Sequence, residues 1–369
     1  MLRSLILATA CLLAAVSAHA GERWSADKAK AWDAAQTWQV GSNYVPASAI
    51  NQLEMWQAET FDPKQIDWEL DLAEKTGMTT MRVFLQDQLW TQDSAGFLDR
   101  MDQFLIIADR HHIKPLFVLF DSCWDAHPHL GKQKDPTPGV HNSGWVQSPG
   151  IDRLQDRSDY PQLEAYVKGV IGRFGHDKRI LAWDVWNEPH EGGLDTIHNA
   201  DDGKLVAALL PQVFVWARSA NPDQPLTSGV FDGGGWKPGE AGLTSIQKTQ
   251  LEQSDIISFH SYAWPEEFEN RVVQLESYGR PVWCTEYMAR SAGSTIDTVL
   301  PVGKAHHVAM FNWGFVDGKS QTRFPWDSWE HPYDKHEPVV WFHDLYHKDG
   351  TPYRQHEIDI IRSLTGYTG

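Results

Sequence analysis

Cysteine, basic residues and long apolar runs are all scarce in this chain. Three cysteines in 369 residues cannot form a disulfide framework, and we expect Cys123 and Cys284 to be free and buried. Lysine and arginine number 32 against 49 acidic residues, and the resulting net charge of −17 repels nucleic-acid phosphates and anionic lipids. After the N-terminal segment, no stretch reaches the ~18 to 20 apolar residues that cross a membrane. These absences argue against a nucleic-acid partner and against a membrane span in the mature chain.

The one long apolar run lies at the N-terminus, in MLRSLILATACLLAAVSAHA. Arg3, the apolar stretch that follows it and the small residues around His19 are the parts of a secretory signal peptide. Cys11 fits a lipoprotein pattern only loosely, because the apolar run continues past it. We therefore predict a signal peptide over residues 1–20, a single folded domain over residues 21–369, and a monomeric protein that is secreted or periplasmic.

Two common active-site motifs are also absent. The first expected strand-to-helix turn, GSNYVP, has no GxGxxG phosphate cradle, and no GxSxG nucleophile elbow follows an expected strand. Adjacent histidines such as His111-His112 and His306-His307 point in different directions on a helix or strand, so they do not form a clamp for a metal ion. We expect neither a metal nor another cofactor.

Short β-branched or aromatic runs alternate with amphipathic helical stretches along the rest of the chain. In FDPKQIDWELDLAEKTG, Pro63 lies just inside the expected helix and Gly77 ends it. Apolar strands that alternate with helices form a parallel sheet, and eight such units predict an α/β fold, a single (β/α)8 TIM barrel with extended loops at its C-terminal face. An open doubly wound sheet is the alternative, and the missing phosphate cradle disfavours it. The expected strands are 37–44, 79–86, 114–121, 180–187, 225–230, 256–262, 281–287 and 307–314.

Tryptophan is abundant, with 18 residues in the chain. Several lie beside Gly, Pro, Asp or His in loop-like segments such as SCWDAHPH, FDGGGW and FPWDSWEHPY. A flat apolar ring with a polar edge is a surface on which a sugar can stack, and it is equally a good core filler. Tryptophans in these segments are therefore candidate sugar platforms.

Polar residues recur where the expected strands end, which is where a (β/α)8 barrel builds its active site. Glu188 follows the fourth strand and Glu286 lies in the seventh, and a facing pair of carboxylates is the equipment of glycoside hydrolysis. The two must differ in protonation, so we expect Glu188 to be protonated near neutral pH, and Arg82 and Tyr262 to hold Glu286 ionised. The polar and aromatic residues at strand ends are Arg82, Asp121, Asn187, Glu188, His260, Tyr262, Glu286 and Trp313.

Three of these segments resemble motifs of the retaining (β/α)8 glycoside hydrolases of the cellulase-like clan, best exemplified by glycoside hydrolase family 5. WDVWNEP is similar to the Asn-Glu-Pro signature of strand four, SFHSY to the His-x-Tyr element of strand six, and VWCTEYM to the nucleophile strand. The resemblance implies that Glu188 is the general acid/base and Glu286 the nucleophile of a double displacement on β-linked oligo- or polysaccharides.

The same resemblance implies supporting roles for the other residues. Asn187 would contact the sugar 2-hydroxyl, Tyr262 would orient the nucleophile, and Trp313 would lie under the sugar that precedes the scissile bond. His260 would be a pocket residue, and Arg82 matches the arginine of strand two.

Two loops depart from the family pattern. Many members have a histidine near the end of strand three, where this chain has Asp121, Ser122, Cys123 and Trp124, and either Asp121 or His127 could take its place. The loop over residues 317–338 is long, rich in Trp, Arg and Asp, and matches nothing in the family. Both loops, with Trp124 in the first, are expected to line the substrate cleft.

Two alternatives to hydrolysis remain open at this point. A barrel that binds glycan without cleaving it is the first, although such proteins typically lose one carboxylate and this chain keeps both. A transglycosylase is the second, because it uses the same two-step chemistry with a different acceptor. Sugar identity and endo or exo action do not follow from these motifs.

Overall fold

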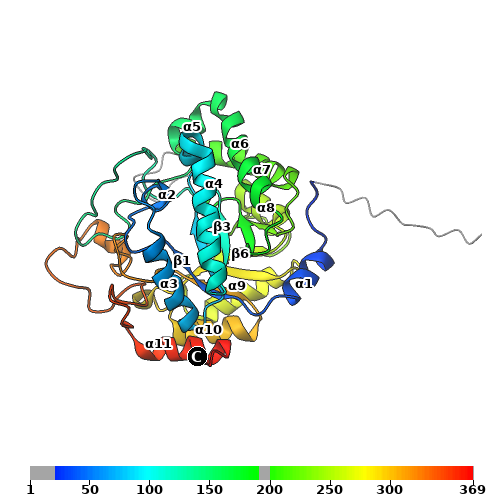
Figure 1. The fold of residues 1–369 in the computed structure, drawn as a ribbon. Helices are drawn as coiled ribbons and strands as arrows, with labels where there is room; N and C mark the ends of the chain where they lie inside the picture. Colours follow the sequence, from blue (N-terminus) through cyan, green and yellow to red (C-terminus); the bar gives the residue numbers. More distant parts are fainter. Residues whose placement is uncertain (1–20, 191–199, 369) are drawn as a thin grey trace, which may run out of the picture.

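The computed structural model describes residues 21–190 and 200–368, which form a barrel of eight parallel strands surrounded by helices (Figure 1). All eight expected strands are present, so the prediction of a (β/α)8 barrel is confirmed. The predicted signal peptide, residues 1–20, lies outside the described residues. The strands are β1 (Val40–Tyr44), β2 (Thr80–Phe84), β3 (Lys114–Val118), β4 (Ala182–Asp184), β5 (Leu226–Thr227), β6 (Ile257–His260), β7 (Val282–Tyr287) and β8 (Ala309–Asn312).

The strands follow the order β5-β4-β3-β2-β1-β8-β7-β6, and each neighbouring pair is parallel. The remaining seam, between β5 and β6, is bridged just beyond β5, where Val230 pairs with Phe259. The amide of His260 donates to the carbonyl of Val230 at 2.9 Å. Every strand therefore points its C-terminal end to the same mouth of the barrel, where the site is built.

The helices that connect the strands begin and end at local signals in the sequence. In α3 the Asp62 side chain accepts hydrogen bonds from two backbone amides, Pro63 occupies the first turn, and Gly77 ends the helix with a φ of 86°. The α-helices are α1 (Ala26–Ala34), α2 (Gln52–Trp56), α3 (Pro63–Thr76), α4 (Asp87–Arg110), α5 (Ile151–Gln155), α6 (Tyr160–Phe174), α7 (Ala200–Ser219), α8 (Ser245–Gln253), α9 (Pro265–Glu276), α10 (Ile296–Ala305) and α11 (Gln355–Thr365).

Four of these helices were not expected from the sequence. The short helices α2 and α5 lie within loops, and α1 precedes the barrel. Helix α8 has a polar sequence, SIQKTQLEQ, in which Ile246 and Leu251 are the only buried apolar residues. A capping box at Thr244 and Gln247 starts it. Its weak apolar periodicity explains why the sequence did not indicate a helix between β5 and β6.

Helix α1 covers the end of the barrel opposite the mouth. Its Trp32 packs on Trp283 of β7, with ring centroids 6.0 Å apart, and the indole nitrogen of Trp283 donates to Asp33 at 3.0 Å. Trp32 also rests on a buried cluster inside the barrel that includes Leu116 and Phe311. This end is therefore sealed by apolar side chains, and the open mouth lies at the other end.

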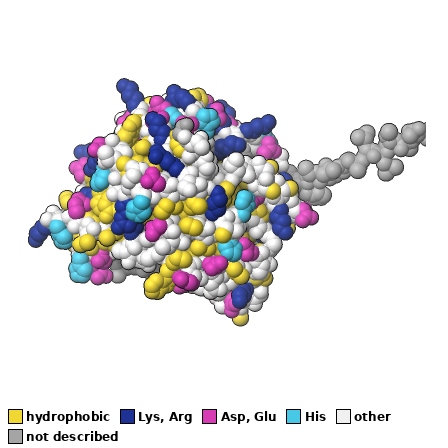
Figure 2. All heavy atoms as spheres, turned by 90° about the horizontal axis from the view of Figure 1, so that it is seen from below, with side chains coloured by type: hydrophobic (Ala, Val, Ile, Leu, Met, Phe, Trp, Pro, Cys, Tyr) yellow, Lys and Arg dark blue, Asp and Glu magenta, His cyan; other side chains and the backbone are white. Residues whose placement is uncertain are grey.

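Charged side chains of both signs are dispersed over the face shown in Figure 2 and do not gather into a patch of one sign. Among the described helices, none is long and apolar enough to cross a membrane. Cys123 and Cys284 are both free, and Cys284 is fully buried as expected, whereas Cys123 is only partly buried.

Candidate active site

Arg82, on β2, is the central cation beneath the mouth. Its side chain is fully buried and donates to Oδ2 of Asp184 at 2.7 Å and to Oε1 of Glu286 at 2.8 Å. It also donates to the side-chain oxygens of Asn43 at 2.8 Å and Asn187 at 2.7 Å. One guanidinium thus connects β1, β2, β4 and β7, and it compensates two buried carboxylates at once.

Glu286 lies in β7 with one carboxylate oxygen on Arg82 and the other on Tyr262. The Tyr262 hydroxyl donates to Oε2 of Glu286 at 2.7 Å. Burial nevertheless raises the pKa of the Glu286 carboxyl above its ordinary value, and the neighbouring Glu188 carboxylate raises it further, while Arg82 and Tyr262 act in the opposite direction. The expected contacts of Glu286 with Arg82 and Tyr262 are therefore present. Burial has the larger effect, however, and the pKa of Glu286 is raised.

Glu188 faces Glu286 from the end of β4, with His260 between them. Oε1 of Glu188 lies 2.7 Å from Nδ1 of His260, and the same nitrogen lies 3.6 Å from Oε2 of Glu286. Burial lowers the pKa of His260 to about 4, so this ring is neutral near pH 7. A neutral ring can either donate a hydrogen bond to an ionised Glu188 or accept one from a protonated Glu188.

The backbone at Glu188 has a φ of 43°, in the left-handed region that residues other than glycine seldom adopt. Such conformations cost energy and gather at functional sites, where the surrounding structure holds them. The side chain that this turn carries lines the cavity above the barrel mouth.

Asp121 lies beneath this pair and not in the mouth. It follows β3, is buried, and accepts hydrogen bonds from Asn187 at 2.9 Å and from the indole nitrogen of Trp145 at 2.6 Å. Burial raises the pKa of Asp121 to about 6. Its position makes it a support for the Asn187 amide. His127, the other candidate for the strand-three position, is exposed and faces Asp152 at 3.8 Å, away from the mouth.

A cavity of ≈ 760 Å³ opens above the two glutamates. That volume lies within the range of about 300 to 1,000 Å³ that small-molecule sites occupy. Six of the predicted residues line it, namely Trp124, Asn187, Glu188, Tyr262, Glu286 and Trp313. We call this space the central cavity. The remaining three predicted residues, Arg82, Asp121 and His260, lie directly beneath it and contact its lining.

Further residues line the cavity, most of them from the two loops that were expected to line the substrate cleft; Phe231 was not foreseen. Cys123 lies beside Glu188, and Phe231 follows β5. From the loop after β8, Trp326 and Trp329 reach in on a short 3-10 helix, η3 (Trp326–Trp329). Asp184, buried on β4 against Arg82, had a visible signal, because an aspartate inside the apolar run LAWDVW needs a partner. Phe231 had none, since loop conformation decides which side chains face the cavity.

Two groups of side chains have the composition of a metal site. In the first, ligand atoms of Glu188, His260 and Glu286 all lie within 4.8 Å of one another. Two ligands of a tetrahedral zinc stand about 3.3 Å apart, given bonds of about 2.0 to 2.1 Å. The 2.7 Å contact between Glu188 and His260 is shorter than that, and it fits a direct hydrogen bond.

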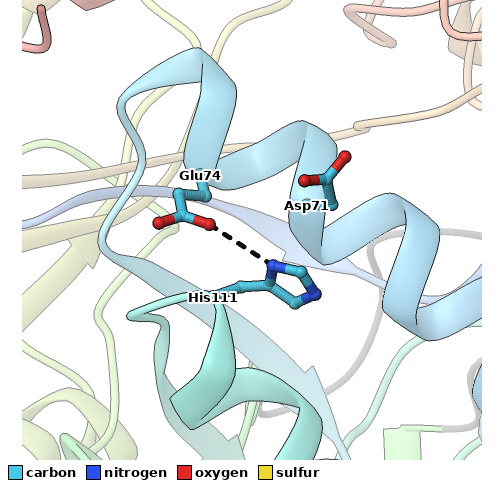
Figure 3. Close-up of side chains that lie close together, drawn as sticks. All are labelled: Asp71, Glu74 and His111. Atoms are coloured by element: carbon cyan, nitrogen blue, oxygen red, sulfur yellow. Dashed lines mark hydrogen bonds and ion pairs between the residues drawn. The ribbon is translucent and has the colours of Figure 1, made fainter. Parts of the chain in front are cut away.

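The second group, Asp71, Glu74 and His111, lies on the outside of the barrel, where α3 meets the end of α4 (Figure 3). His111 contacts Glu74 through Nδ1 at 3.3 Å and Asp67 through Nε2 at 2.7 Å, so carboxylates occupy both ring nitrogens. His112 also reaches Glu74, at 2.7 Å. Both rings reach the same carboxylate because His112 lies beyond the helix, with a φ of 57°.

Several solved structures with the same fold as this chain are glycoside hydrolases. An exo-β-1,4-mannosidase from Opitutaceae bacterium strain TAV5 matches 89% of the chain at a TM-score of 0.58 and 17% identity, over 60% of its own length. An endo-1,4-β-D-mannanase from Thermotoga petrophila RKU-1 matches 89% of the chain at a TM-score of 0.54 and 15% identity, over 99% of its length. A family 5 mannosidase from Rhizomucor miehei matches 88% of the chain at a TM-score of 0.53 and 15% identity, over 92% of its length. The chain shares the (β/α)8 barrel fold of these enzymes.

Curated relatives are somewhat more similar in sequence, but they match shorter stretches of the chain. A mannan endo-1,4-β-mannosidase A of Podospora anserina is 22% identical over 268 residues, which are 63% of this chain and 67% of that protein. Another, of Emericella nidulans, is 27% identical over 104 residues, which are 28% of this chain and 25% of that protein. The aligned stretches thus span between a quarter and two thirds of these relatives. No family model matches the chain.

Proposed function

We propose that this protein is a retaining glycoside hydrolase that cleaves β-linked glycans, with mannose-containing chains as its substrate class. The observation that carries the proposal is the placement of Glu188 and Glu286, which both line the central cavity with carboxylate oxygens within 4.8 Å of each other. Retaining enzymes separate their two carboxyl groups by about 5 to 5.5 Å, and inverting ones by about 6.5 to 9.5 Å to leave room for water. The spacing here favours retention.

In the first step of this mechanism Glu286 attacks the anomeric carbon, and the glycosidic bond breaks as Glu188 gives its proton to the leaving oxygen. Arg82 and Tyr262 bind the two oxygens of Glu286 and fix the direction of attack. The products are a glycosyl ester on Glu286 and a free hydroxyl on the leaving sugar.

In the second step Glu188, now ionised, takes a proton from a water that attacks the same carbon. The ester breaks, Glu286 regains its charge, and the sugar leaves with its original configuration. His260 can serve both steps as a neutral ring: Nδ1 accepts a hydrogen bond from protonated Glu188 in the tautomer with its proton on Nε2, and donates one to ionised Glu188 in the tautomer with its proton on Nδ1.

Two further groups bind the sugar in this proposal. The Asn187 amide, held by Arg82 and Asp121, faces the cavity next to the nucleophile and would contact the 2-hydroxyl. Trp313 would lie under the sugar as an apolar platform. The assignment of mannose rests on the names of the relatives and structural neighbours, which are mannanases and mannosidases.

The proposal extends to where the protein works. The predicted signal peptide over residues 1–20 and the acidic chain suit action outside the cytoplasm on a neutral glycan, by a monomer that needs no cofactor. N-terminal sequencing of the exported protein tests the cleavage site, and a mature chain that still carries residues 1–20 would contradict it.

The test is a screen of the protein against β-mannans, β-glucans, xylans and aryl β-glycosides, alongside Glu188→Gln and Glu286→Gln. Glu267→Gln, an exposed glutamate on α9, is the matched control. We expect cleavage by wild type and control and its loss in both site variants. Proton NMR of the first product should show the β-anomer, and an α-anomer would overturn retention.

The two alternatives predict other results in the same screen. A non-catalytic barrel would bind glycans in both wild type and variants and release no product. A transglycosylase would, when given excess oligosaccharide acceptor, make products longer than its substrate. Mannose-free substrates that are cleaved faster than mannans would overturn the assignment of mannose alone.

A further inference from the structure

We propose that the loops after β3 and β8 close one side of the central cavity, so that the protein removes sugar units from chain ends and does not cut within chains. This inference rests on the proposed function and concerns which substrates can enter its site. Trp124, after β3, and Trp329, on η3 after β8, stack face to face with ring centroids 4.9 Å apart and planes 10° apart. Both indoles line the cavity. We call this pair the tryptophan wall.

The wall spans a defined sector of the mouth. In the barrel β1 and β2 lie between β8 and β3, so the two loops meet above β1 and β2. Trp313 lies in that sector, where its ring centroid is 5.8 Å from that of Phe84 at the end of β2. Trp124 packs against the same apolar cluster. The wall therefore stands beside the proposed platform for the sugar that is attacked.

The opposite sector belongs to the leaving group. Glu188, which would protonate the leaving oxygen, follows β4, and Phe231 and Tyr262 line the cavity after β5 and β6. A polysaccharide cut in its middle would have to leave the cavity through both sectors. The wall obstructs the sector beyond Trp313, so the sugar on that platform would have to be the last of its chain.

Hydrogen bonds between the two loops make the wall a fixed part of the fold. The amide of Asn142 donates to the carbonyl of Ser320 at 2.8 Å, and Gln321 donates to the carbonyl of Thr137 at 2.7 Å. The amide of His141 donates to the hydroxyl of Ser328, within η3, at 2.9 Å. These bonds join the two loops along their length. Separating the loops would break several hydrogen bonds at once, each of which contributes to stability.

The wall also carries groups that could bind a chain end. Asp327 and Glu330, next to Trp329, line the cavity with carboxylates. Carboxylates accept hydrogen bonds from sugar hydroxyls, and a terminal sugar has one more free hydroxyl than an internal sugar. Trp326 packs edge-on against Tyr262, with ring centroids 5.1 Å apart. Helix η3 therefore extends from the wall to the tyrosine that donates to Glu286.

Product analysis on a single oligosaccharide tests the inference. The probe is β-1,4-mannohexaose tagged with 2-aminobenzamide at its reducing end, sampled during the first tenth of the reaction. We expect free mannose and tagged pentaose as the only early products. Tagged dimer or trimer at that stage would overturn the inference while leaving the glycosidase intact. Absence of any cleavage, here and across the whole panel of glycans, would overturn the proposed function as well.

Variants test whether the tryptophan wall is the cause. Trp329→Ala and Trp124→Ala should each raise the share of early tagged dimer and trimer at least several-fold. Trp68→Ala is the matched control, because Trp68 on α3 is 38% exposed and Trp329 is 39% exposed. It should keep the wild-type pattern. If wild type cleaves from the chain end and both wall variants do the same, then a feature other than the tryptophan wall excludes internal sites.

Discussion

The thiol of Cys123 lies 3.3 Å from Oε2 of Glu188, within hydrogen-bonding distance for sulfur. Burial raises the pKa of this thiol well above its ordinary value, and the carboxylates around it raise it further, so it stays protonated and donates. Asn187 donates to the same sulfur at 3.4 Å, which fixes its orientation. Glu188 therefore has a neutral donor on one oxygen and His260 on the other.

The first prediction concerns this thiol. A donor favours the ionised form of Glu188, whereas the proposed first step needs the protonated form. Cys123→Ala should thus move the basic limb of the kcat/KM profile upward by about 0.5 to 1 pH unit, if the bond contributes about 1 kcal/mol. Cys123→Ser keeps a donor and should stay near wild type. A basic limb that is identical in all three proteins would remove Cys123 from the mechanism.

The second prediction concerns Tyr262 and the acid limb. Its phenol favours the ionised form of Glu286, whose pKa burial already raises, so Tyr262→Phe should raise that pKa further and move the acid limb to higher pH. Loss of a hydrogen bond to a charged nucleophile, about 1.5 to 3 kcal/mol, should lower kcat/KM about 10- to 100-fold.

A kcat/KM profile from pH 4 to 8 measures both effects of Tyr262→Phe. Tyr160→Phe is the control, because the hydroxyl of Tyr160 bonds a backbone carbonyl on α5, away from the mouth. An acid limb that moves to lower pH in Tyr262→Phe would contradict the proposed role of the phenol.

The sequence predicted those site residues whose positions are determined by the β-strands. Arg82, Asn187, His260 and Glu286 lie on or directly after β-strands, and parallel strands deliver their ends to one mouth. The loop that carries Trp326 and Trp329 was expected to line the cleft, but its path depends on contacts with another loop about 180 residues away, such as Gln321 with Thr137. Such contacts leave no periodic signal in a single sequence.

The fold shows the same division. All eight strands were predictable from their apolar, β-branched character, and α3 from its Pro63 and Gly77 signals. Helix α8 was not, because its sequence is polar and its position follows from the need to connect β5 to β6. The direction of the pKa shift at Glu286 was also beyond the sequence, since burial depends on everything that surrounds the carboxyl.

The third prediction concerns Arg82, which compensates both Asp184 and Glu286 inside the barrel. Arg82→Met would leave two buried carboxylates without their cation and should lower the free energy of unfolding by about 3 to 5 kcal/mol, with loss of activity. Arg82→Met combined with Asp184→Asn should recover part of the stability and none of the activity. Urea unfolding and a glycan assay measure the two quantities. Equal stability of Arg82→Met and wild type would rule out the ion pairs as a structural requirement.

The fourth prediction is a pH dependence of stability that arises away from the site. Glu69, on α3, is fully buried and accepts hydrogen bonds from the hydroxyl of Tyr44 at 2.7 Å and the amide of Ala47 at 2.9 Å. Burial raises the pKa of Glu69 from 4.5 to about 7. Its folded pKa is therefore above its unfolded pKa, so its contribution to stability is fully present below about pH 4.5 and is lost as the pH rises through about 7.

Glu69→Gln should remove that contribution to the slope. Between pH 4.5 and 7.5 the free energy of unfolding of wild type should fall relative to that of Glu69→Gln by up to about 3 kcal/mol, at 1.36 kcal/mol per unit of pKa difference. Other buried groups that titrate in this range contribute equally to the free energy of unfolding of both proteins, so their contributions cancel in the difference. Urea unfolding at four pH values measures it, and Glu267→Gln, exposed on α9, should parallel wild type. Parallel curves for Glu69→Gln and wild type would mean that Glu69 has the same pKa in the folded and unfolded chains.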